Sequence, residues 1–186
     1  MTGWARALLL CGMLLPGAPP LAQSCNPAAP ATADGQRFRD NGDGTVTDLS
    51  SGLTWSRCSL GQQWRNGTCA GRARPLLWGV AALLASDGWR LPELTELAGL
   101  LELRCVRPAI DLRVFPETPP GPYWTATRFV NRDGSFWQLM FLQGANLPER
   151  ADSAAFVRLV RDTPRGARQI TAGVPGRPAE RLDTGH

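Results

Sequence analysis

The sequence predicts an α+β domain, built mostly of antiparallel strands with two helices and joined internally by two disulfides. Short runs that alternate apolar and polar residues are separated by turn residues in both halves of the chain. Between these halves lie two segments whose apolar residues recur at helical spacing. An even number of cysteines follows a leader of the secretory type, which favours disulfides over free thiols.

Residues 1–22 have the layout of a secretory signal peptide. Arg6 gives a positive start, residues 7–15 form a short apolar run, and residues 16–22 supply a small-residue and proline exit. We predict cleavage at the end of this segment and export to the periplasm or the extracellular space. No later segment is long and apolar enough to cross a membrane. Lipidation of Cys25 is the alternative, but the residues before it lack the leucine usual at such sites.

Three segments follow the leader. Residues 23–35 are rich in alanine and proline and predict a linker. Residues 36–162 carry the periodic apolar pattern of a single folded domain. From residue 163 to residue 186 this periodicity ends, and we predict a disordered tail.

The first strands are expected at residues 36–40, 45–49 and 52–58. The stretch DNGDGTVTDLSSGLTW, residues 40–55, also invites comparison with an EF-hand calcium loop. Such a loop needs a leading carboxylate, a glycine at position six and a glutamate at position twelve. Aligning Gly44 with that glycine places an arginine first and a serine twelfth. The stretch therefore predicts a hairpin turn rather than a metal site.

Two helices are expected in the middle of the chain. The first covers residues 75–89 and is ended by Gly88, and its expected buried face comprises Leu76, Val80, Leu83 and Leu84. The second covers residues 91–103, with Pro92 in its first turn, and its expected buried face comprises Leu94, Leu97, Leu100 and Leu101. Glu93 and Glu96 are best explained as carboxylates that complement the helix dipole, rather than as an acid–base pair.

The second half of the chain predicts further strands. They are expected at residues 123–130, 135–144 and 154–162, with turns at residues 131–134 and near Gly144. A proline-rich crossing from residue 105 to residue 122 precedes them.

Removal of the leader leaves Cys25, Cys58, Cys69 and Cys105, which allow three pairings. Cys58 and Cys69 bracket a short segment that contains an Asn-Gly turn. We therefore predict the disulfides Cys58–Cys69 and Cys25–Cys105. A four-cysteine zinc site is disfavoured because its ligand pairs usually lie two to four residues apart.

The residue inventory restricts the chemistry. The chain has no lysine, and its only histidine is the last residue, His186, so no catalytic triad or histidine-ligated metal is available. Arginines and acidic residues nearly balance between residues 23 and 162, so a nucleic-acid interface is not indicated. We expect no enzyme, no catalytic residues and no cofactor; only carboxylate chemistry would remain open.

A ligand site built from aromatic and arginine side chains is the main functional candidate. Aromatic rings stack on sugars, and arginine binds carboxylate or sulfate through two parallel hydrogen bonds. Four tryptophans lie within apolar segments and are expected in the core: Trp55, Trp89, Trp124 and Trp137. The candidate ligand-binding residues lie in predicted loops or next to the predicted hairpin turn: Trp64, Arg65, Arg72, Arg74, Arg128 and Arg132. A merely solvated arginine surface is the alternative.

Five stretches occur in order along the predicted domain: FRDNGDGTVTDLSSGLTWSRCSLGQQW, GWRLPELTEL, PAIDLRVFP, YWTAT and FVRLVRD. Their combination, from about Phe38 to Asp162, resembles the Lcl C-terminal domain family, named after the Legionella collagen-like protein. The resemblance implies a secreted or surface-exposed bacterial domain, similar to C-type-lectin-like folds and without established enzymatic activity. The namesake domain is associated with adhesion and with binding of sulfated glycosaminoglycans.

The chain departs from these relatives in two respects. It has no collagen-like Gly-X-Y region, so the trimeric adhesive stalk is not carried over. It also lacks the Glu-Pro-Asn, Gln-Pro-Asp and Trp-Asn-Asp triplets of calcium-dependent lectins, so calcium-bridged sugar binding is not expected.

Taken together, the sequence predicts an exported binding domain that recognises a glycan, such as a sulfated polysaccharide, or a surface protein. The alternative is a structural or protein-interaction module of an envelope or surface assembly. That alternative predicts an exposed apolar patch around Phe129 and Phe136.

Overall fold

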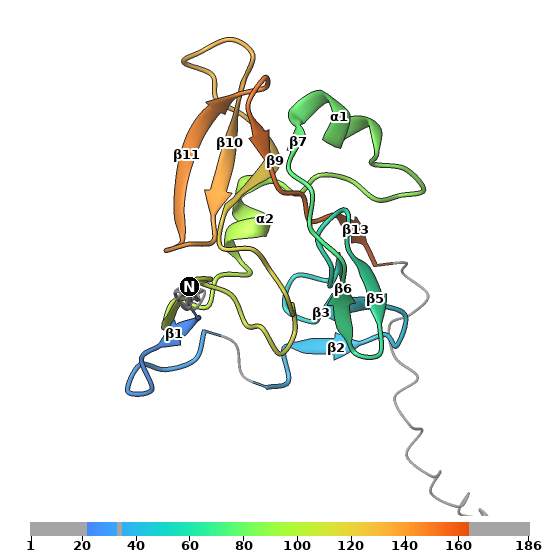
Figure 1. The fold of residues 1–186 in the computed structure, drawn as a ribbon, viewed down its shortest axis with the longest axis vertical. Helices are drawn as coiled ribbons and strands as arrows, with labels where there is room; N and C mark the ends of the chain where they lie inside the picture. The colour runs from blue at the N-terminus through green and yellow to red at the C-terminus, as the bar shows by residue number, and fades with distance from the viewer. Residues whose placement is uncertain (1–21, 33–34, 164–186) are drawn as a thin grey trace, which may run out of the picture.

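The computed structural model describes residues 22–32 and 35–163, and its strand pairings are antiparallel (Figure 1). One sheet has the order β13–β4–β3–β2, formed by Val160–Asp162, Leu53–Ser56, Thr45–Asp48 and Phe38–Asp40. A second has the order β11–β10–β9, formed by Ala145–Arg150, Ser135–Met140 and Pro122–Arg128. The predicted class is confirmed: mostly antiparallel strands with two short helices and two disulfides.

Three small two-stranded pairs complete the described fold. They are β1 with β8 (Ser24–Cys25, Cys105–Val106), β7 with β12 (Leu76–Leu77, Ala154–Ala155), and β5 with β6 (Gln63–Arg65, Thr68–Ala70). The predicted strand at residues 154–162 is therefore divided between two sheets.

Strand β11 was not predicted from the sequence. Its segment, ANLPER, contains Pro148 and charged residues, and so lacks the alternation that marks a strand. A proline is tolerated here because β11 lies at the edge of its sheet, where one side of the strand has no partner.

The stretch that resembled a calcium loop forms the turn between β2 and β3, as predicted. The Asp40 carboxylate accepts the Gly42 N–H at 2.8 Å, and the Asp43 carboxylate accepts the Thr45 N–H at 3.0 Å. These carboxylates therefore stabilise the turn by capping its backbone N–H groups.

A third carboxylate, that of Asp48 at the end of β3, is buried beneath the following turn. It accepts hydrogen bonds from Arg37 Nη2 at 2.7 Å, from Ser50 Oγ at 2.7 Å and from Ser51 Oγ at 2.9 Å. Burial raises the pKa of Asp48, but these donors outweigh the burial and lower the pKa from 3.8 to about 2.

We expect the stability that Asp48 contributes to disappear in acid. Because its pKa is lowered in the folded state, the contribution is fully present above about pH 4 and is lost as the pH falls towards 2. The expected size is about 2 kcal/mol. Urea unfolding of the wild type and of Asp48→Asn between pH 2 and pH 7 measures it. The two curves should converge below pH 4, and curves that stay parallel there would contradict the assignment.

The first predicted helix is much shorter than expected, and its buried face was assigned wrongly. Helix α1 spans only Trp78–Leu83, because Leu76 and Leu77 form β7 instead. Trp78 and Ala81 pack inward, whereas three residues of the predicted buried face, Val80, Leu83 and Leu84, are exposed. The helix ends before Gly88, which lies in the loop beyond it.

The second helix, α2 (Leu94–Ala98), lies where it was predicted but is shorter. Its leucines face inward as expected: Leu97 and Leu100 are buried, and Leu94 and Leu101 pack against the same cluster. At its first turn the Glu93 N–H donates to the Glu96 carboxylate at 2.8 Å. Arg90 also binds Glu96 through two hydrogen bonds of 2.7 Å, which lowers the pKa of that carboxyl.

Two clusters of buried side chains form the core. One surrounds Trp55 and joins the four-stranded sheet to α2, and the other surrounds Trp124 and joins β9 and β10 to α1. Of the four tryptophans expected in the core, Trp55 and Trp124 are buried. Trp89 packs at the edge of the second cluster, and Trp137 is half-exposed on β10.

Both predicted disulfides, Cys25–Cys105 and Cys58–Cys69, are present and are consistent with an exported protein. Residues of the predicted linker contact the domain: the Thr32 N–H, for example, donates to Glu102. Neither α1 nor α2, the helices of the described ranges, has the length and apolar character that a membrane crossing requires. The predicted signal peptide and tail lie almost entirely outside the described residues.

Candidate functional site

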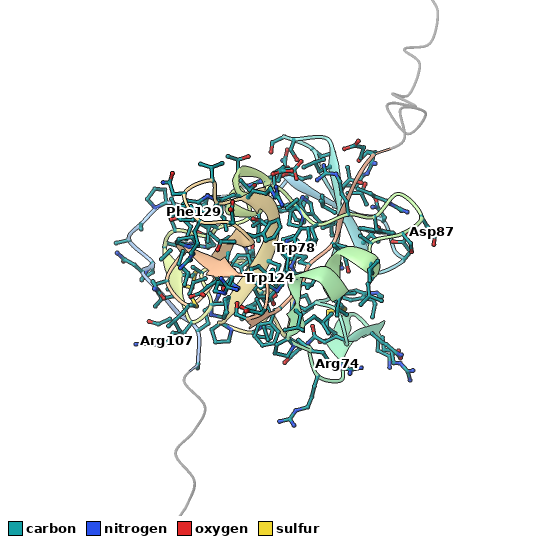
Figure 2. The ribbon with its side chains drawn as sticks, turned by 90° about the horizontal axis from the view of Figure 1, so that it is seen from above. Arg74, Trp78, Asp87, Arg107, Trp124 and Phe129 are labelled. Atoms are coloured by element: carbon teal, nitrogen blue, oxygen red, sulfur yellow. A yellow bond between two sulfur atoms is a disulfide. The ribbon has the colours of Figure 1, made fainter. Side chains whose placement is uncertain are left out.

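The six predicted ligand-binding residues fall into two groups at opposite ends of the domain. Trp64, Arg65, Arg72 and Arg74 lie on the β5–β6 hairpin and the loop after it, while Arg128 and Arg132 lie at the β9–β10 turn (Figure 1). Figure 2 shows Arg74 and Phe129, one from each end, on opposite sides of the ribbon. One compact ligand therefore cannot contact all six side chains.

One face of the Trp64 ring is covered by another side chain of the domain. The Arg57 guanidinium lies over its ring, 4.1 Å from the centroid. Its edge lies against Gly44, where the Cβ of any larger residue would be 2.6 Å from the Trp64 Cβ, so only glycine fits there. Trp64 is consequently half-buried and joins the hairpin to the β2–β3 turn.

Arg57 itself serves the fold rather than a ligand. It is nearly buried, and its guanidinium donates to the Val114 carbonyl at 2.8 Å and to the Arg113 carbonyl at 3.0 Å. It also pairs with Asp40 at 2.7 Å. Each of these contacts joins the residue just before Cys58 to another segment of the chain.

The remaining arginines of this group are exposed and do not converge. Arg65 bonds Gln63 within its own strand at 2.6 Å. Arg72 and Arg74 lie in the loop that leads to β7, and neither has an acidic partner within 4.0 Å among the described residues. The two pockets described below, at the β9–β10 turn and beside the Cys25–Cys105 disulfide, are lined by other residues.

The β9–β10 turn, by contrast, encloses a pocket of about 200 Å³. Its lining comprises Arg128, Phe129, Val130, Arg132, Asp133, Gly134 and Ser135. Arg132 is held in place there because its Nε donates to Ser135 Oγ at 2.9 Å and its Nη2 donates to the Pro148 carbonyl at 2.8 Å. Among the described residues, neither Arg128 nor Arg132 forms an ion pair.

Aromatic rings surround these two arginines. Phe129 and Trp137 meet edge to face with centroids 5.1 Å apart, and Arg132 lies 5.9 Å from the Phe129 ring. Arg128 lies 5.7 Å from the Phe136 ring, whose other neighbour is Trp78, stacked at 3.7 Å. From the sequence, Trp137 was expected in the core, so it was missed as a residue of this site. Its position close to the predicted turn at residues 131–134 could have indicated it.

The apolar patch expected around Phe129 and Phe136 is not formed. Phe136 is buried at the start of β10, covered by Trp78, while Phe129 is only half-exposed. The prediction of an exposed apolar patch around Phe129 and Phe136 is therefore wrong. Four exposed apolar residues of the described chain lie on or next to α1 instead: Leu77, Val80, Leu83 and Leu84.

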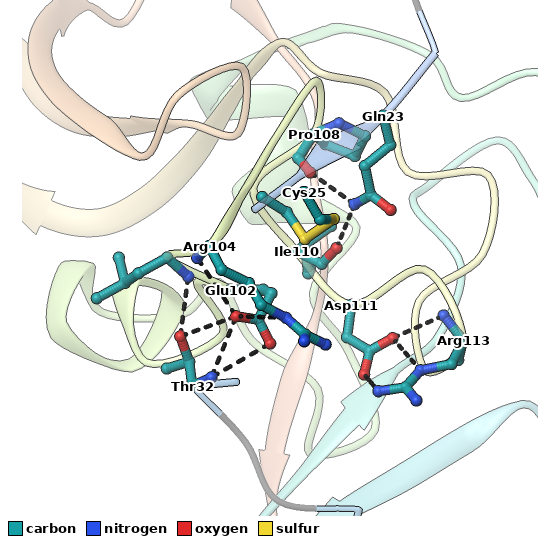
Figure 3. The surroundings of a disulfide bond; sticks show 11 residues. Gln23, Cys25, Thr32, Glu102, Arg104, Pro108, Ile110, Asp111 and Arg113 are labelled. Carbon is teal, nitrogen blue, oxygen red and sulfur yellow. Dashed lines mark hydrogen bonds and ion pairs between the residues drawn. A yellow bond between two sulfur atoms is a disulfide. The ribbon is translucent and has the colours of Figure 1, made fainter. Parts of the chain in front are cut away.

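A second pocket, of about 240 Å³, lies beside the Cys25–Cys105 disulfide, as Figure 3 shows. Its charged groups are bound to one another: Glu102 accepts the Thr32 N–H and pairs with Arg104, and Asp111 pairs with Arg113 at 2.7 Å. Gln23 donates to the Pro108 and Ile110 carbonyls. These contacts fasten the N-terminal segment to the domain.

Comparison with known proteins identifies one family. The sequence profile of the Lcl C-terminal domain matches residues 44–161, which include both halves of the fold and the β9–β10 turn. Neither the curated proteins nor the solved structures contain a match to the chain.

Proposed function

Because the chain belongs to the Lcl C-terminal domain family, we propose that it is a non-catalytic binding domain whose site is the pocket at the β9–β10 turn. The proposed ligand is an acidic glycan, the class that includes sulfated polysaccharides. One observation carries the proposal: two arginines without acidic partners among the described residues line a pocket beside half-exposed aromatic rings.

The chemistry of this pocket suits a sugar acid or sulfate ester. A guanidinium donates two parallel hydrogen bonds to such an anion, and the Phe129 and Trp137 rings offer apolar surface to the sugar. Arg132 uses two N–H groups on Ser135 and Pro148, which fixes the side chain and leaves its other N–H groups for the ligand. Because the side chain is already ordered, binding loses less conformational entropy.

Arg128→Ala is the first test, measured on immobilised heparin and on a glycan array over a salt series. Loss of a charge-assisted hydrogen bond should weaken binding about tenfold. Arg74→Ala is the matched control, since it removes the same charge from an exposed site outside the pocket, and should change affinity less than about twofold. Asp133→Asn removes the acidic residue from the pocket lining and should strengthen binding.

If Arg128→Ala and Arg74→Ala weaken glycan binding equally, the glycan is attracted by the positive charge of the whole surface and not by a site at the β9–β10 turn. Absence of binding by the wild type would instead favour the protein-interaction alternative.

A further inference from the structure

Helix α1 and the residues on either side of it are apolar. From Pro75 to Ala85 the sequence reads PLLWGVAALLA, without a polar side chain. A helix of this kind is normally covered on every side, whereas a surface helix carries polar residues outward. Here only one side is covered, because Trp78 and Ala81 pack on the cluster around Trp124 and Phe136.

The opposite side forms an apolar surface that we call the α1 face. Its members and their exposed fractions are Leu77 (46%), Val80 (44%), Leu83 (84%) and Leu84 (51%). Val80, Leu83 and Leu84 occupy positions i, i+3 and i+4, which one side of a helix brings together, and Leu77 precedes the helix at the end of β7. Figure 1 shows α1 at the periphery of the domain.

Positive charge adjoins the α1 face at its N-terminal end. Arg74 lies three residues before Leu77, and its own N–H donates to the Leu60 carbonyl at 2.9 Å, which fixes the loop against the domain. Arg72 lies in the same loop, and both side chains are exposed. Beyond the helix, Asp87 is the first charged residue.

We propose that the α1 face docks on the surface of an anionic lipid bilayer. Leu83 and Leu84 enter the boundary between headgroups and acyl chains, and Arg72 and Arg74 contact the lipid phosphates. A fluid bilayer can accommodate the exposed leucines, and its negative charge complements the two exposed arginines. The inference rests on α1 and the preceding loop, and does not depend on the pocket at the β9–β10 turn.

Vesicle co-sedimentation tests this inference, using the chain recovered from the export compartment of an expression host. The probes are vesicles of phosphatidylglycerol with phosphatidylcholine, and of phosphatidylcholine alone. The variants are Leu83→Ser with Leu84→Ser, Arg72→Gln with Arg74→Gln, and the control Leu103→Ser. Leu103 is also an exposed apolar residue, 74% accessible, but it lies between α2 and β8, outside the α1 face and the pocket at the β9–β10 turn.

We expect the wild type to bind the anionic vesicles more strongly than the neutral ones. The double leucine variant should weaken anionic binding about tenfold or more, and the double arginine variant by a similar factor. Leu103→Ser should bind like the wild type. Equal melting temperatures of all variants would exclude unfolding as the cause, as expected for exposed positions.

Two results would overturn the inference. One is a wild type that does not sediment with anionic vesicles. The other is a double leucine variant that binds as well as the wild type, which would place any membrane attraction elsewhere in the chain. Neither result bears on glycan binding, because none of these double variants alters the pocket at the β9–β10 turn.

Discussion

Replacing Cys25 and Cys105 together by alanine is expected to lower the free energy of unfolding by about 4–5 kcal/mol. The disulfide joins residues 80 apart in sequence, and so removes much conformational freedom from the unfolded chain. In the folded protein it also holds β1 against β8, next to the Gln23 and Thr32 contacts that fasten the N-terminal segment. Urea unfolding under oxidising conditions measures the loss.

The second disulfide supplies the matched control. Cys58–Cys69 spans only 11 residues, so loop closure alone predicts a loss of about 3 kcal/mol for the double alanine variant. The long disulfide should therefore contribute more. Equal losses, or a larger loss for Cys58–Cys69, would show that packing of the buried Cys58 and Cys69 sulfurs outweighs chain entropy.

Replacing Arg158 by methionine should destabilise the domain by about 3 kcal/mol. Arg158 is fully buried and has no acidic partner among the described residues. Its guanidinium donates to the Ser56 and Arg57 carbonyls and to Thr118 Oγ1, and lies 4.7 Å from the Phe115 ring centroid. Burial lowers the pKa of Arg158, yet removal of the group would leave two carbonyls and a hydroxyl without donors.

Two further variants make this test specific. Arg158→Lys keeps the charge but presents one compact ammonium, which cannot reproduce the planar fork, so most of the loss should remain. Arg39→Met alters an exposed arginine on β2 and should change stability by less than about 0.5 kcal/mol. An Arg158→Met variant as stable as the wild type would mean that burying the charge costs as much as its hydrogen bonds contribute.

Local signals accounted for a large part of the fold. The β2–β3 turn needed only the Asn-Gly and Asp-Gly pairs between alternating strands, and α2 needed only Pro92, Glu96 and its leucines. The cysteine pairing followed from the turn residues between Cys58 and Cys69. In each case the decisive residues lie close together in sequence.

Features that depend on distant partners were missed or assigned wrongly. Periodicity detected the apolar residues of α1, but the packing of Trp78 on Phe136, far along the chain, selected which side is buried. Trp64 offered an aromatic ring, but the fold places it beneath the guanidinium of Arg57, the residue that follows β4. Strand β11 exists because β10 supplies its hydrogen-bond partners, although its own residues are poor strand formers.

The candidate site shows the same division. Composition and loop position selected the arginines, but could not show that Arg128 and Arg132 lie apart from Arg72 and Arg74. Nor could they place Trp137 beside Phe129, because the contact needs the β9–β10 register. By itself, the sequence determined the turns, α2, the pairing of the cysteines and the family. Only the tertiary structure decided which side chains are covered and which arginines share a pocket, because burial and proximity arise from contacts between segments that no local pattern encodes.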